Sequence, residues 1–392
     1  MSSDQASARP RGAGDALRAA FSSVTGWLTP GSGEQSDGSK GNRRASSQPS
    51  WLRRHWIVAS VIVVTLVTVG GVGGWLFYLN SQLGNIDRVP LTLAESKRPP
   101  VTEGEELNIL IAGADNGPGP SIAADVAADR WRAGSHRSDT IMILHLPADR
   151  ETAYLVSIPR DSYVKLYDEN GDYTYTDKIN AAFSLYGPSG YISTIEHLTK
   201  LRMDHLAIID WDGFKDVTQA IGGVRVFVPE TFYDDSQNLR WKKGWQTLEG
   251  QQALQYVRTR HGLANGDFDR IARQQNFLRA MMAKLLSGGV TNSPTKLTSA
   301  LKAITANLTV DDGWSNGDIR DLALSVRGIN TDEVTFLTAP LGRYDTSDNG
   351  QSVVLLDPKK SKALWRALAD GELDRYAARH SGDTLRKPDK VK

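Results

Sequence analysis

An uncharged apolar run over residues 56–79 constrains this chain more than any other feature of its sequence. As a helix rising about 1.5 Å per residue, its 24 residues reach about 36 Å, enough to cross a bilayer with some tilt. The run exceeds the roughly 7–15 apolar residues of a cleaved signal peptide, and no clear cleavage site of small residues follows it. The sequence therefore predicts one transmembrane helix over 56–79.

Basic residues are concentrated on the N-terminal side of this run. No acidic residue lies between Gly38 and His55, and residues 80–96 after the run carry only three charged side chains, Asp87, Arg88 and Glu95. Because cytoplasmic flanks carry the excess of Lys and Arg, we expect a cytoplasmic N-terminus and a single pass through the cell membrane. More than 300 residues then lie outside the cytoplasm. The basic residues of the N-terminal flank are Lys40, Arg43, Arg44, Arg53 and Arg54.

The flanking segments differ in composition from the rest of the chain. Residues 1–50 contain 11 Ser, 7 Gly and 3 Pro, and too little apolar surface to offset the entropy of ordering, so we expect a disordered cytoplasmic tail over 1–55. The polar, Pro-containing segment 80–104 is typical of an extracytoplasmic stalk. We expect the folded catalytic domain at 105–379 and a flexible basic tail at 380–392.

The composition excludes several kinds of chemistry. The chain has no cysteine, which excludes disulfides, thiolate metal ligands and a thiol nucleophile. Its formal net charge is +1, so the recognition of an anion has to be local rather than a property of the whole surface. We find no Walker loop, nucleophile elbow, Rossmann fingerprint or His-Glu-x-x-His helix.

Strand-like runs alternate with helical patterns from residue 105 onward. The runs at 107–112 and 140–146 are mostly apolar and do not alternate cleanly, which indicates a sheet covered on both faces. We therefore predict an α/β fold with a central sheet between layers of helices. The predicted strands are 107–112, 140–146, 153–158, 205–210, 224–228 and 255–260. The predicted helices are 188–201, 211–221, 269–286, 316–326 and 358–368.

Two carboxylates stand at the ends of predicted strands. Asp115 follows the first strand and Asp139 precedes the next, separated by a Gly-, Pro- and Ala-rich loop. Mg²⁺ takes one or two carboxylates together with phosphate oxygens and water, so this pair could hold one. Alternatively, Asp115 caps a turn and Asp139 pairs with Arg137.

Arginines follow or occupy other predicted strands. Arg160 comes directly after an apolar strand that Pro159 ends. On the predicted strand 255–260 a period of two places Arg258 and Arg260 on one face. Two adjacent guanidiniums suit a phosphate or pyrophosphate, although a charged edge strand that resists aggregation is an equal alternative.

The helix predicted from Asp269 carries further polar residues beside its apolar stripe. Arg270 and Gln274 lie on the margin of that stripe, where each needs a polar partner, whereas the helical spacing directs Arg273 toward solvent. Lys178 precedes another helical pattern, and a solvated lysine is its ordinary alternative.

Seven motifs in order make this chain resemble the LytR-CpsA-Psr family of bacterial cell-wall ligases. The resemblance covers roughly residues 105–373 and includes the arrangement of anchor, stalk and external domain. The motifs are Asp115, Arg137-Ser-Asp139, Ser157-Ile-Pro-Arg160-Asp161, Lys178-Ile-Asn180, Ile221-Gly-Gly-Val, Tyr256-Val-Arg258-x-Arg260 and Asp269-Arg270-x-x-Arg273-Gln274-Gln275.

The resemblance implies transfer of a glycopolymer from a polyprenyl-pyrophosphate carrier onto peptidoglycan, with a central mixed sheet and Mg²⁺ or Mn²⁺ as cofactor. Asp115 and Asp139 would then be metal ligands, and Asp139 could also orient or deprotonate the acceptor hydroxyl. The implied catalytic cations are Arg137, Arg160, Arg258 and Arg260, and the implied substrate-binding residues are Arg270, Gln274, Lys178 and Arg273.

The resemblance leaves some assignments open. The loop between Asp115 and Asp139 is long, so Asp125 or Asp129 could replace one of the two carboxylates. An apolar groove for the lipid could draw on Leu278, Met281, Met282 and Leu285, which equally suit an ordinary core.

Two rival functions would use the same features. A polyprenyl-pyrophosphate phosphatase would deliver the phosphate to water instead of a sugar hydroxyl. A non-enzymatic envelope sensor or transcriptional attenuator would need its cytoplasmic tail to bind a partner or DNA. The tail lacks the pattern of a DNA-binding helix, so we expect no nucleic-acid partner.

Overall fold

The computed structural model describes residues 70–391, apart from 72, 102–103, 116–120 and 260–266. The expected cytoplasmic tail and most of the predicted transmembrane run lie outside the described residues. In the part of the chain that is described, no helix combines the length and the apolar character needed to cross a membrane.

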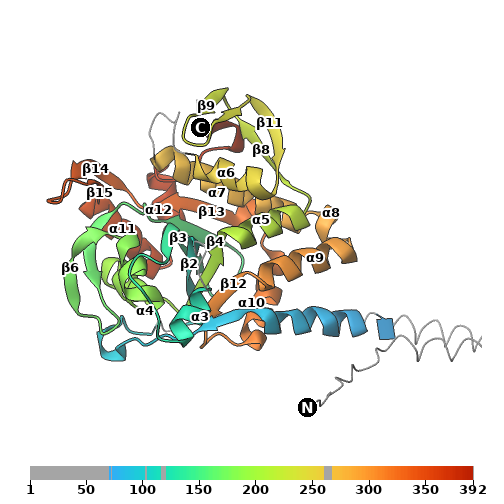
Figure 1. The fold of residues 1–392 in the computed structure, drawn as a ribbon, viewed down its shortest axis with the longest axis horizontal. Helices are drawn as coiled ribbons and strands as arrows, with labels where there is room; N and C mark the ends of the chain where they lie inside the picture. The colour runs from blue at the N-terminus through green and yellow to red at the C-terminus, as the bar shows by residue number, and fades with distance from the viewer. Residues whose placement is uncertain (1–69, 72, 102–103, 116–120, 260–266, 392) are drawn as a thin grey trace, which may run out of the picture. The chain divides into compact units, whose positions relative to one another are not determined.

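A seven-stranded mixed sheet forms the centre of the fold (Figure 1), with strand order β1-β12-β7-β2-β3-β4-β13. The pairs β2–β3, β3–β4 and β12–β7 are antiparallel, whereas β2–β7, β4–β13 and β1–β12 are parallel. In this order the strands span Asp87–Val89, Leu308–Asp311, His205–Asp210, Leu107–Asp115, Arg137–Leu146, Ala153–Ser157 and Val334–Thr338.

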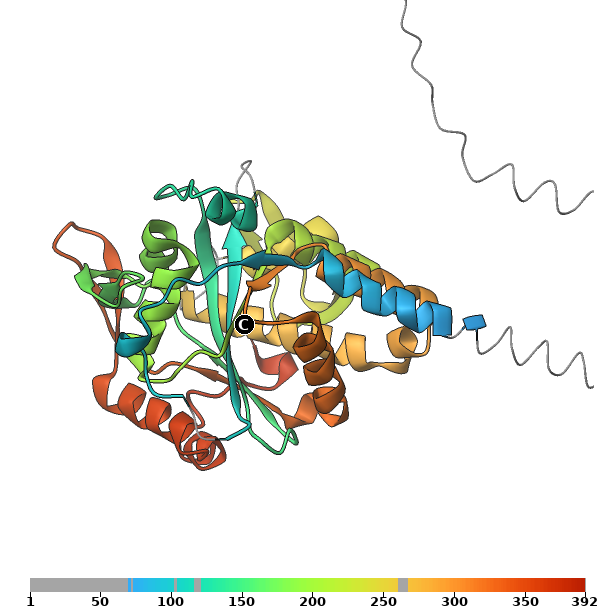
Figure 2. The same cartoon turned by 90° about the horizontal axis from the view of Figure 1, so that it is seen from below.

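Both faces of the central strands are buried, as the apolar runs predicted. Along β2, Leu110 packs into the cluster under α4 (Asn180–Thr199) and α11 (Pro358–Ala369), while its neighbour Ile109 belongs to the cluster on the opposite face. Leu278 and Met282 of α7 (Asp267–Leu286) and Leu322 of α10 (Asn316–Ser325) pack against that second cluster. The sheet therefore lies between helices (Figure 2).

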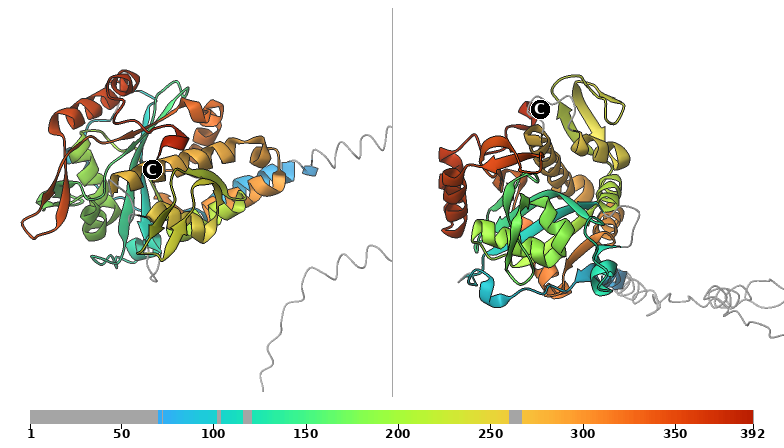
Figure 3. Two further views of the ribbon diagram at one scale, coloured as in Figure 1. Left: turned by 90° about the horizontal axis from the view of Figure 1, so that it is seen from above. Right: turned by 60° about the vertical axis from the view of Figure 1, so that its left-hand side comes forward.

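A smaller unit stands beside the central sheet. The strand predicted at 224–228 is β8, but it pairs with β11 (Gly244–Leu248) in a separate two-stranded sheet. Figure 3 shows this sheet next to α6 (Gly250–Arg258) and α7, and Val226, Val257 and Phe277 share one apolar cluster there. This unit packs against α7 through Phe277.

The strand predicted at 255–260 is wrong. Residues 250–258 form the helix α6, in which Ala253, Leu254 and Val257 are buried at helical spacing. A short apolar pattern fits both periods, and Gly250, with φ of 52°, provides the turn that begins a helix here. Arg258 is therefore the last residue of a helix and not part of a strand face.

The expected stalk and flexible tail are also corrected. Residues 87–89, inside the expected stalk 80–104, form the edge strand β1, and Val89 is fully buried. Inside the expected flexible tail 380–392, the Leu385 backbone N–H donates to the Phe336 carbonyl, and Val391 is buried. Apolar side chains too widely spaced to form a periodic pattern anchor both segments.

The remaining elements form hairpins and covering helices. Helix α4 begins before the predicted 188–201, but Gly187, with φ of 65°, interrupts it immediately before Pro188. The hairpin strands are β5 (Tyr163–Tyr167), β6 (Tyr173–Lys178), β9 (Phe232–Asp234), β10 (Leu239–Trp241), β14 (Leu341–Thr346) and β15 (Ser352–Leu356). The other helices are α3 (Ile122–Ala127), α5 (Trp211–Ala220), α8 (Gly288–Thr291), α9 (Pro294–Thr305) and α12 (Leu373–Arg379).

Candidate active site

One edge of the central sheet gathers most of the predicted site residues. Strand β2 ends at Asp115, the antiparallel β3 begins at Arg137, and β4 ends shortly before Arg160. The parallel strand β7 ends at the same edge, directly before Trp211. Chain direction alone therefore brings these side chains together.

A cavity of about 450 Å³ opens at this edge, and its walls carry more positive than negative side chains. Three arginines face one carboxylate, so an anionic ligand is favoured over a cationic or neutral one. The lining residues are Asp139, Arg160, Trp211, Ser236, Gln237, Arg258, Arg270 and Gln274.

Asp139 reaches this cavity through a bulge in β3. Gly113 pairs with Thr140 and Ala114 pairs with Ser138, so Asp139 is the extra residue between them. A β-carbon added at Gly113 would lie 2.9 Å from that of Thr140, which explains why glycine stands opposite the bulge. Bulges redirect a side chain, and here the redirected side chain is the cavity's carboxylate.

Arg160 is the cation that pairs with Asp139. Its Nη1 forms an ion pair with Asp139 Oδ1, and its Nε lies 3.7 Å from Asp161 Oδ2. Lys178 continues this row of alternating charges, with Nζ 3.3 Å from Asp161 Oδ1. The alternative that Asp139 pairs with Arg137 is therefore not what the structure shows.

Arg258 connects the cavity to the second predicted carboxylate. Its guanidinium lies 5.3 Å from the ring centre of Trp211, in a cation–π arrangement, and its Nη2 lies 3.8 Å from Asp115 Oδ2. The side chain is 46% exposed, which leaves it accessible to a ligand. Asp115 is thus held beside the cavity although it does not line it.

Helix α7 presents Arg270 and Gln274 to the cavity, as the sequence predicted. Arg270 is buried, and the Gln274 side-chain amide donates to the Val257 carbonyl of α6 at 3.3 Å. The next glutamine, Gln275, is held elsewhere, because its amide donates to the Leu337 carbonyl and to Ser157 Oγ. Of these two adjacent glutamines, Gln274 lines the cavity and Gln275 bonds to strands of the central sheet.

Arg273 is a correction to the sequence prediction. It is 1% exposed instead of solvated, and its guanidinium lies 4.8 Å from the ring centres of both Phe232 and Tyr256. Burial lowers the pKa of Arg273, and the nearby Tyr256, Asp269 and Asp234 act against that effect. Residues of β9 and α6 cover this face of α7, so Arg273 supports the wall of the site and does not line it.

Sequence reasoning missed the loop between β9 and β10. Ser236 and Gln237 line the cavity, and the buried carboxylate of Asp234 holds both. Asp234 Oδ1 accepts from the Ser236 backbone N–H at 3.1 Å and from its hydroxyl at 2.6 Å, and Oδ2 accepts from Gln237 Nε2 at 2.7 Å. An aspartate followed by serine two residues later is the signal of an Asx turn, and it could have identified this loop.

The other predicted residues lie in different places. Arg137 is exposed and is not among the described residues that line the cavity. Arg260 lies outside the described residues. Asp125, the proposed substitute carboxylate, accepts a hydrogen bond from His136 Nε2 at 3.0 Å and lies 3.8 Å from Arg130, so it is engaged away from the cavity.

Asp115 and Asp139, the two carboxylates assigned to a divalent cation, both lie at this edge, and each faces an arginine. Among the described residues there is no group of three or more His, Cys, Asp or Glu side chains suited to a metal. Two carboxylates at adjacent strand ends nevertheless fit Mg²⁺ or Mn²⁺ if phosphate oxygens and water complete the coordination. The residues present therefore fit a metal that binds together with a phosphate ligand.

Comparison with known proteins gives consistent matches. The LytR_cpsA_psr family is matched by residues 83–370 of this chain. The chain is 34% identical over 315 residues to the probable cell wall biosynthesis protein LcpB of Corynebacterium glutamicum, covering 79% of this chain and 70% of LcpB. It is 32% identical to LcpA of the same organism over 68% of this chain, but the match spans only 56% of the length of LcpA.

Relatives with more specific names and a solved structure also match. The polyisoprenyl-teichoic acid–peptidoglycan teichoic acid transferase TagU of Enterococcus faecalis is 30% identical over 69% of this chain and 82% of its own length. The crystal structure of Bacillus subtilis TagV aligns with a TM-score of 0.55 at 24% identity, covering 69% of this chain and 98% of that chain. That structure supports the mixed α/β fold.

Proposed function

Because the chain belongs to the LytR-CpsA-Psr family, we propose that it transfers a glycopolymer from a polyprenyl-pyrophosphate carrier onto peptidoglycan. Relatives named as teichoic acid–peptidoglycan transferases support a transferase of this general kind. We further propose that residues 56–79 anchor the enzyme in the cell membrane, with the catalytic domain outside the cytoplasm.

The observation that carries the proposal is the cluster of Arg160, Arg258 and Arg270 around one cavity with Asp139. The pyrophosphate that links lipid and glycan carries one negative charge on each phosphate, and guanidiniums can bind its oxygens in bidentate fashion. Phosphoryl transfer needs positioning and charge neutralisation more than a nucleophilic side chain. A cavity with three arginines and no cysteine is suited to this chemistry.

The proposed reaction forms one bond and breaks one bond at the same phosphorus. The acceptor hydroxyl oxygen attacks the phosphorus that carries the glycopolymer, and the bond from that phosphorus to the bridging oxygen of the pyrophosphate breaks. Polyprenyl phosphate leaves with the bridging oxygen. Asp139, oriented by its ion pair with Arg160, accepts the proton of the attacking hydroxyl. The arginines bind the oxygens on which negative charge develops.

A divalent cation is part of this proposal. Asp115 and Asp139 would hold Mg²⁺ or Mn²⁺ together with oxygens of the pyrophosphate. The cation would supply additional neutralisation of the phosphate charge.

The function can be tested with the full chain in detergent, a polyprenyl-pyrophosphate glycan, Mg²⁺ and peptidoglycan oligomers. Mass spectrometry would show where the sugar phosphate ends up. We expect a phosphodiester on the oligomer, and we expect it to be absent with Arg258→Ala. Release of phosphorylated glycan into water without transfer would contradict a ligase and identify a phosphatase.

A further inference from the structure

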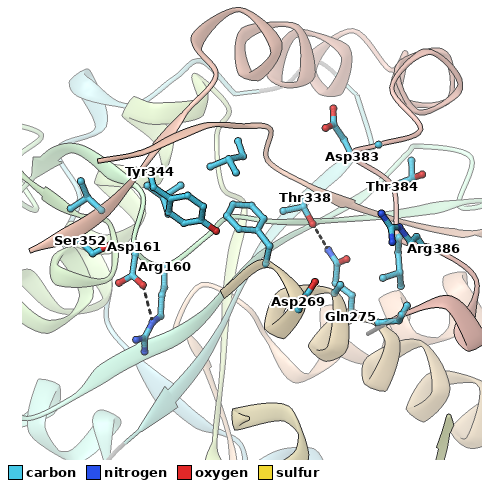
Figure 4. A pocket seen from close by; sticks show the side chains of 18 of the residues that line it. Arg160, Asp161, Asp269, Gln275, Thr338, Tyr344, Ser352, Asp383, Thr384 and Arg386 are labelled. Carbon is cyan, nitrogen blue, oxygen red and sulfur yellow. Dashed lines mark hydrogen bonds and ion pairs between the residues drawn. The ribbon is translucent and has the colours of Figure 1, made fainter. Parts of the chain in front are cut away.

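A second cavity adjoins the candidate active site. It has a volume of about 810 Å³ and lies between the start of α7, the β14–β15 hairpin and residues 382–391. Arg160 lines both cavities, so the two meet at the cation that pairs with Asp139. Figure 4 shows Arg160 and Asp161 at one end of the second cavity and Arg386 at the other. A group bound there would lie next to the reacting phosphate of the proposed function.

The charges of the two cavities differ. The first has three arginines and one carboxylate, whereas the second has four cations and three carboxylates. The excess of cations over carboxylates is therefore smaller in the second cavity, so a polyanionic chain gains less there than in the first. A largely uncharged ligand with many hydroxyls finds both donors and acceptors there. The charged residues of the second cavity are Arg160, Lys178, Arg386, Lys390, Asp161, Asp269 and Asp383.

Aromatic rings and hydroxyl groups complete the walls. Tyr344 and Phe268 meet edge to face with ring centres 5.9 Å apart, and Tyr344 is 52% exposed. The polarised C–H bonds of a sugar ring pack well on an aromatic face, and its hydroxyls donate to carboxylates and accept from cations. Thr338, between the charged ends, and Thr384, at the end of Arg386, add further hydroxyl groups (Figure 4). The volume falls within the range of about 300–1,000 Å³ that small-molecule sites occupy.

We propose that this second cavity binds the saccharide that accepts the glycopolymer, with Tyr344 as the platform for one sugar ring. The proposal rests on the proposed function, because it assigns the cavity to the acceptor of that reaction. The balance of charges favours the acceptor glycan over a polyanionic donor chain. The shared Arg160 places the end of the acceptor beside Asp139, which takes the hydroxyl proton.

Direct binding tests this assignment without the donor. A peptidoglycan tetrasaccharide freed of its peptides would be titrated into the full chain in detergent, followed by intrinsic fluorescence or NMR. We expect Tyr344→Ala to weaken binding at least tenfold, Tyr344→Phe to retain it, and Ser352→Trp, which adds a bulky ring on the cavity wall, to block it. Tyr173→Ala is the matched control, because Tyr173 is a similarly exposed tyrosine (54%) on another hairpin.

The outcomes separate this inference from the proposed function. Equal saccharide affinity in wild type and Tyr344→Ala, or no saccharide binding by a wild type that transfers glycopolymer, would overturn the acceptor site. A stronger effect of Tyr344→Ala on donor binding than on saccharide binding would assign the cavity to the donor and also overturn it. If the wild type binds the saccharide in a Tyr344-dependent manner but transfers nothing to it, the proposed function fails while the saccharide site stands.

Discussion

Arg258 illustrates how much one side chain can contribute at this site. It ends α6, stacks over Trp211 and lies near Asp115, while almost half of its side chain is accessible. We predict that Arg258→Ala lowers kcat/KM for transfer by about 10²–10³-fold, or about 3–4 kcal/mol, because a charge-binding donor is lost at the transition state. The kcat/KM of Arg258→Lys should lie between those of the wild type and Arg258→Ala, since lysine keeps the charge but not the bidentate geometry.

Steady-state transfer rates would check this prediction. Arg375→Ala serves as the control, because Arg375 is an exposed arginine of α12 that pairs with Glu372 away from the cavity. Unchanged kcat/KM in Arg258→Ala would remove this residue from the proposed pyrophosphate site.

Replacing the single residue Asp139 tests whether the site binds a divalent cation. If Asp139 binds Mg²⁺ together with the pyrophosphate, the melting temperature of the wild type should rise when both are added and fall back with EDTA. Asp139→Ala should lose the Mg²⁺-dependent part of that rise. Asp149→Ala, an exposed acid in the turn after β3, should keep it. The same Mg²⁺-dependent rise in Asp139→Ala and wild type would be incompatible with the assignment.

At the scale of elements, the β9–β10 loop depends on one buried carboxylate. Burial alone would raise the pKa of Asp234, but hydrogen bonds from Ser236 and Gln237 outweigh it and hold the pKa below its usual value. A lowered pKa means that the carboxylate stabilises the fold above its unfolded pKa, about 3.8, and that this stabilisation is lost as the pH falls through the folded pKa.

We predict that Asp234→Asn lowers the free energy of unfolding at pH 7 by about 1–3 kcal/mol and weakens its acid dependence. Urea unfolding at pH 7 and pH 3 would measure both effects. Asp235→Asn, at the exposed neighbouring position, should change the free energy of unfolding and its acid dependence less than Asp234→Asn does. An equal loss in the two variants would show that the hydrogen bonds to Asp234 do not organise the loop.

A second pH-sensitive group, His145, lies in the central sheet. Burial, assisted by the charge of Arg150, lowers the pKa of His145 on β3 to about 4, and its Nδ1 lies 2.8 Å from Asn108 Oδ1 on β2. The unfolded chain therefore binds a proton between about pH 6.5 and pH 4 that the folded chain does not. In this window the fold should lose stability as the pH decreases, by about 3 kcal/mol in total.

Replacing His145 with Gln should remove most of this slope, which equilibrium unfolding at pH 4.5, 5.5 and 6.5 would reveal. His380→Gln, in the C-terminal region, should leave the slope in place. If the slope of His145→Gln matches that of the wild type, another group causes the acid sensitivity.

At the scale of the whole molecule, the C-terminal residues join separate parts of the fold. Leu385 bonds to β13, and the Asn276 side chain of α7 donates to the Pro388 carbonyl at 3.4 Å. Val391 is 3% exposed, and burying a valine stabilises a protein by about 1.5–3 kcal/mol. We predict that a chain ending at Arg379 melts several degrees lower and binds the acceptor saccharide more weakly, because Asp383, Thr384 and Arg386 leave the second cavity.

Thermal unfolding and saccharide titration would check this prediction together. The single substitution Val391→Ala should lower the melting temperature less than the truncation does. It leaves the charged residues of the second cavity in place. A truncated chain with an unchanged melting temperature would show that these contacts add little to the fold.

Much of the architecture and part of the site follow from the sequence alone. Mostly apolar runs without clean alternation at β2 and β3 predict a sheet buried on both faces, because the apolar side chains on each face of such a strand need apolar neighbours. Polar residues near the ends of β2, β3 and β4 identify Asp115, Asp139 and Arg160 as site candidates, and the ends of paired strands share one edge of the sheet. These inferences require only local pattern and chain direction.

The tertiary structure decided what local pattern cannot encode. The alternation around Arg258 suits a strand or a helix, and packing against β8 and α7 selects the helix. The helical spacing along α7 directs Arg273 toward solvent, and only the packing of β9 and α6 against this helix buries it between Phe232 and Tyr256. Ser236, Gln237 and the C-terminal residues likewise reach the two cavities through contacts distant in sequence. Burial depends on which surfaces meet, and that is a property of the assembled fold.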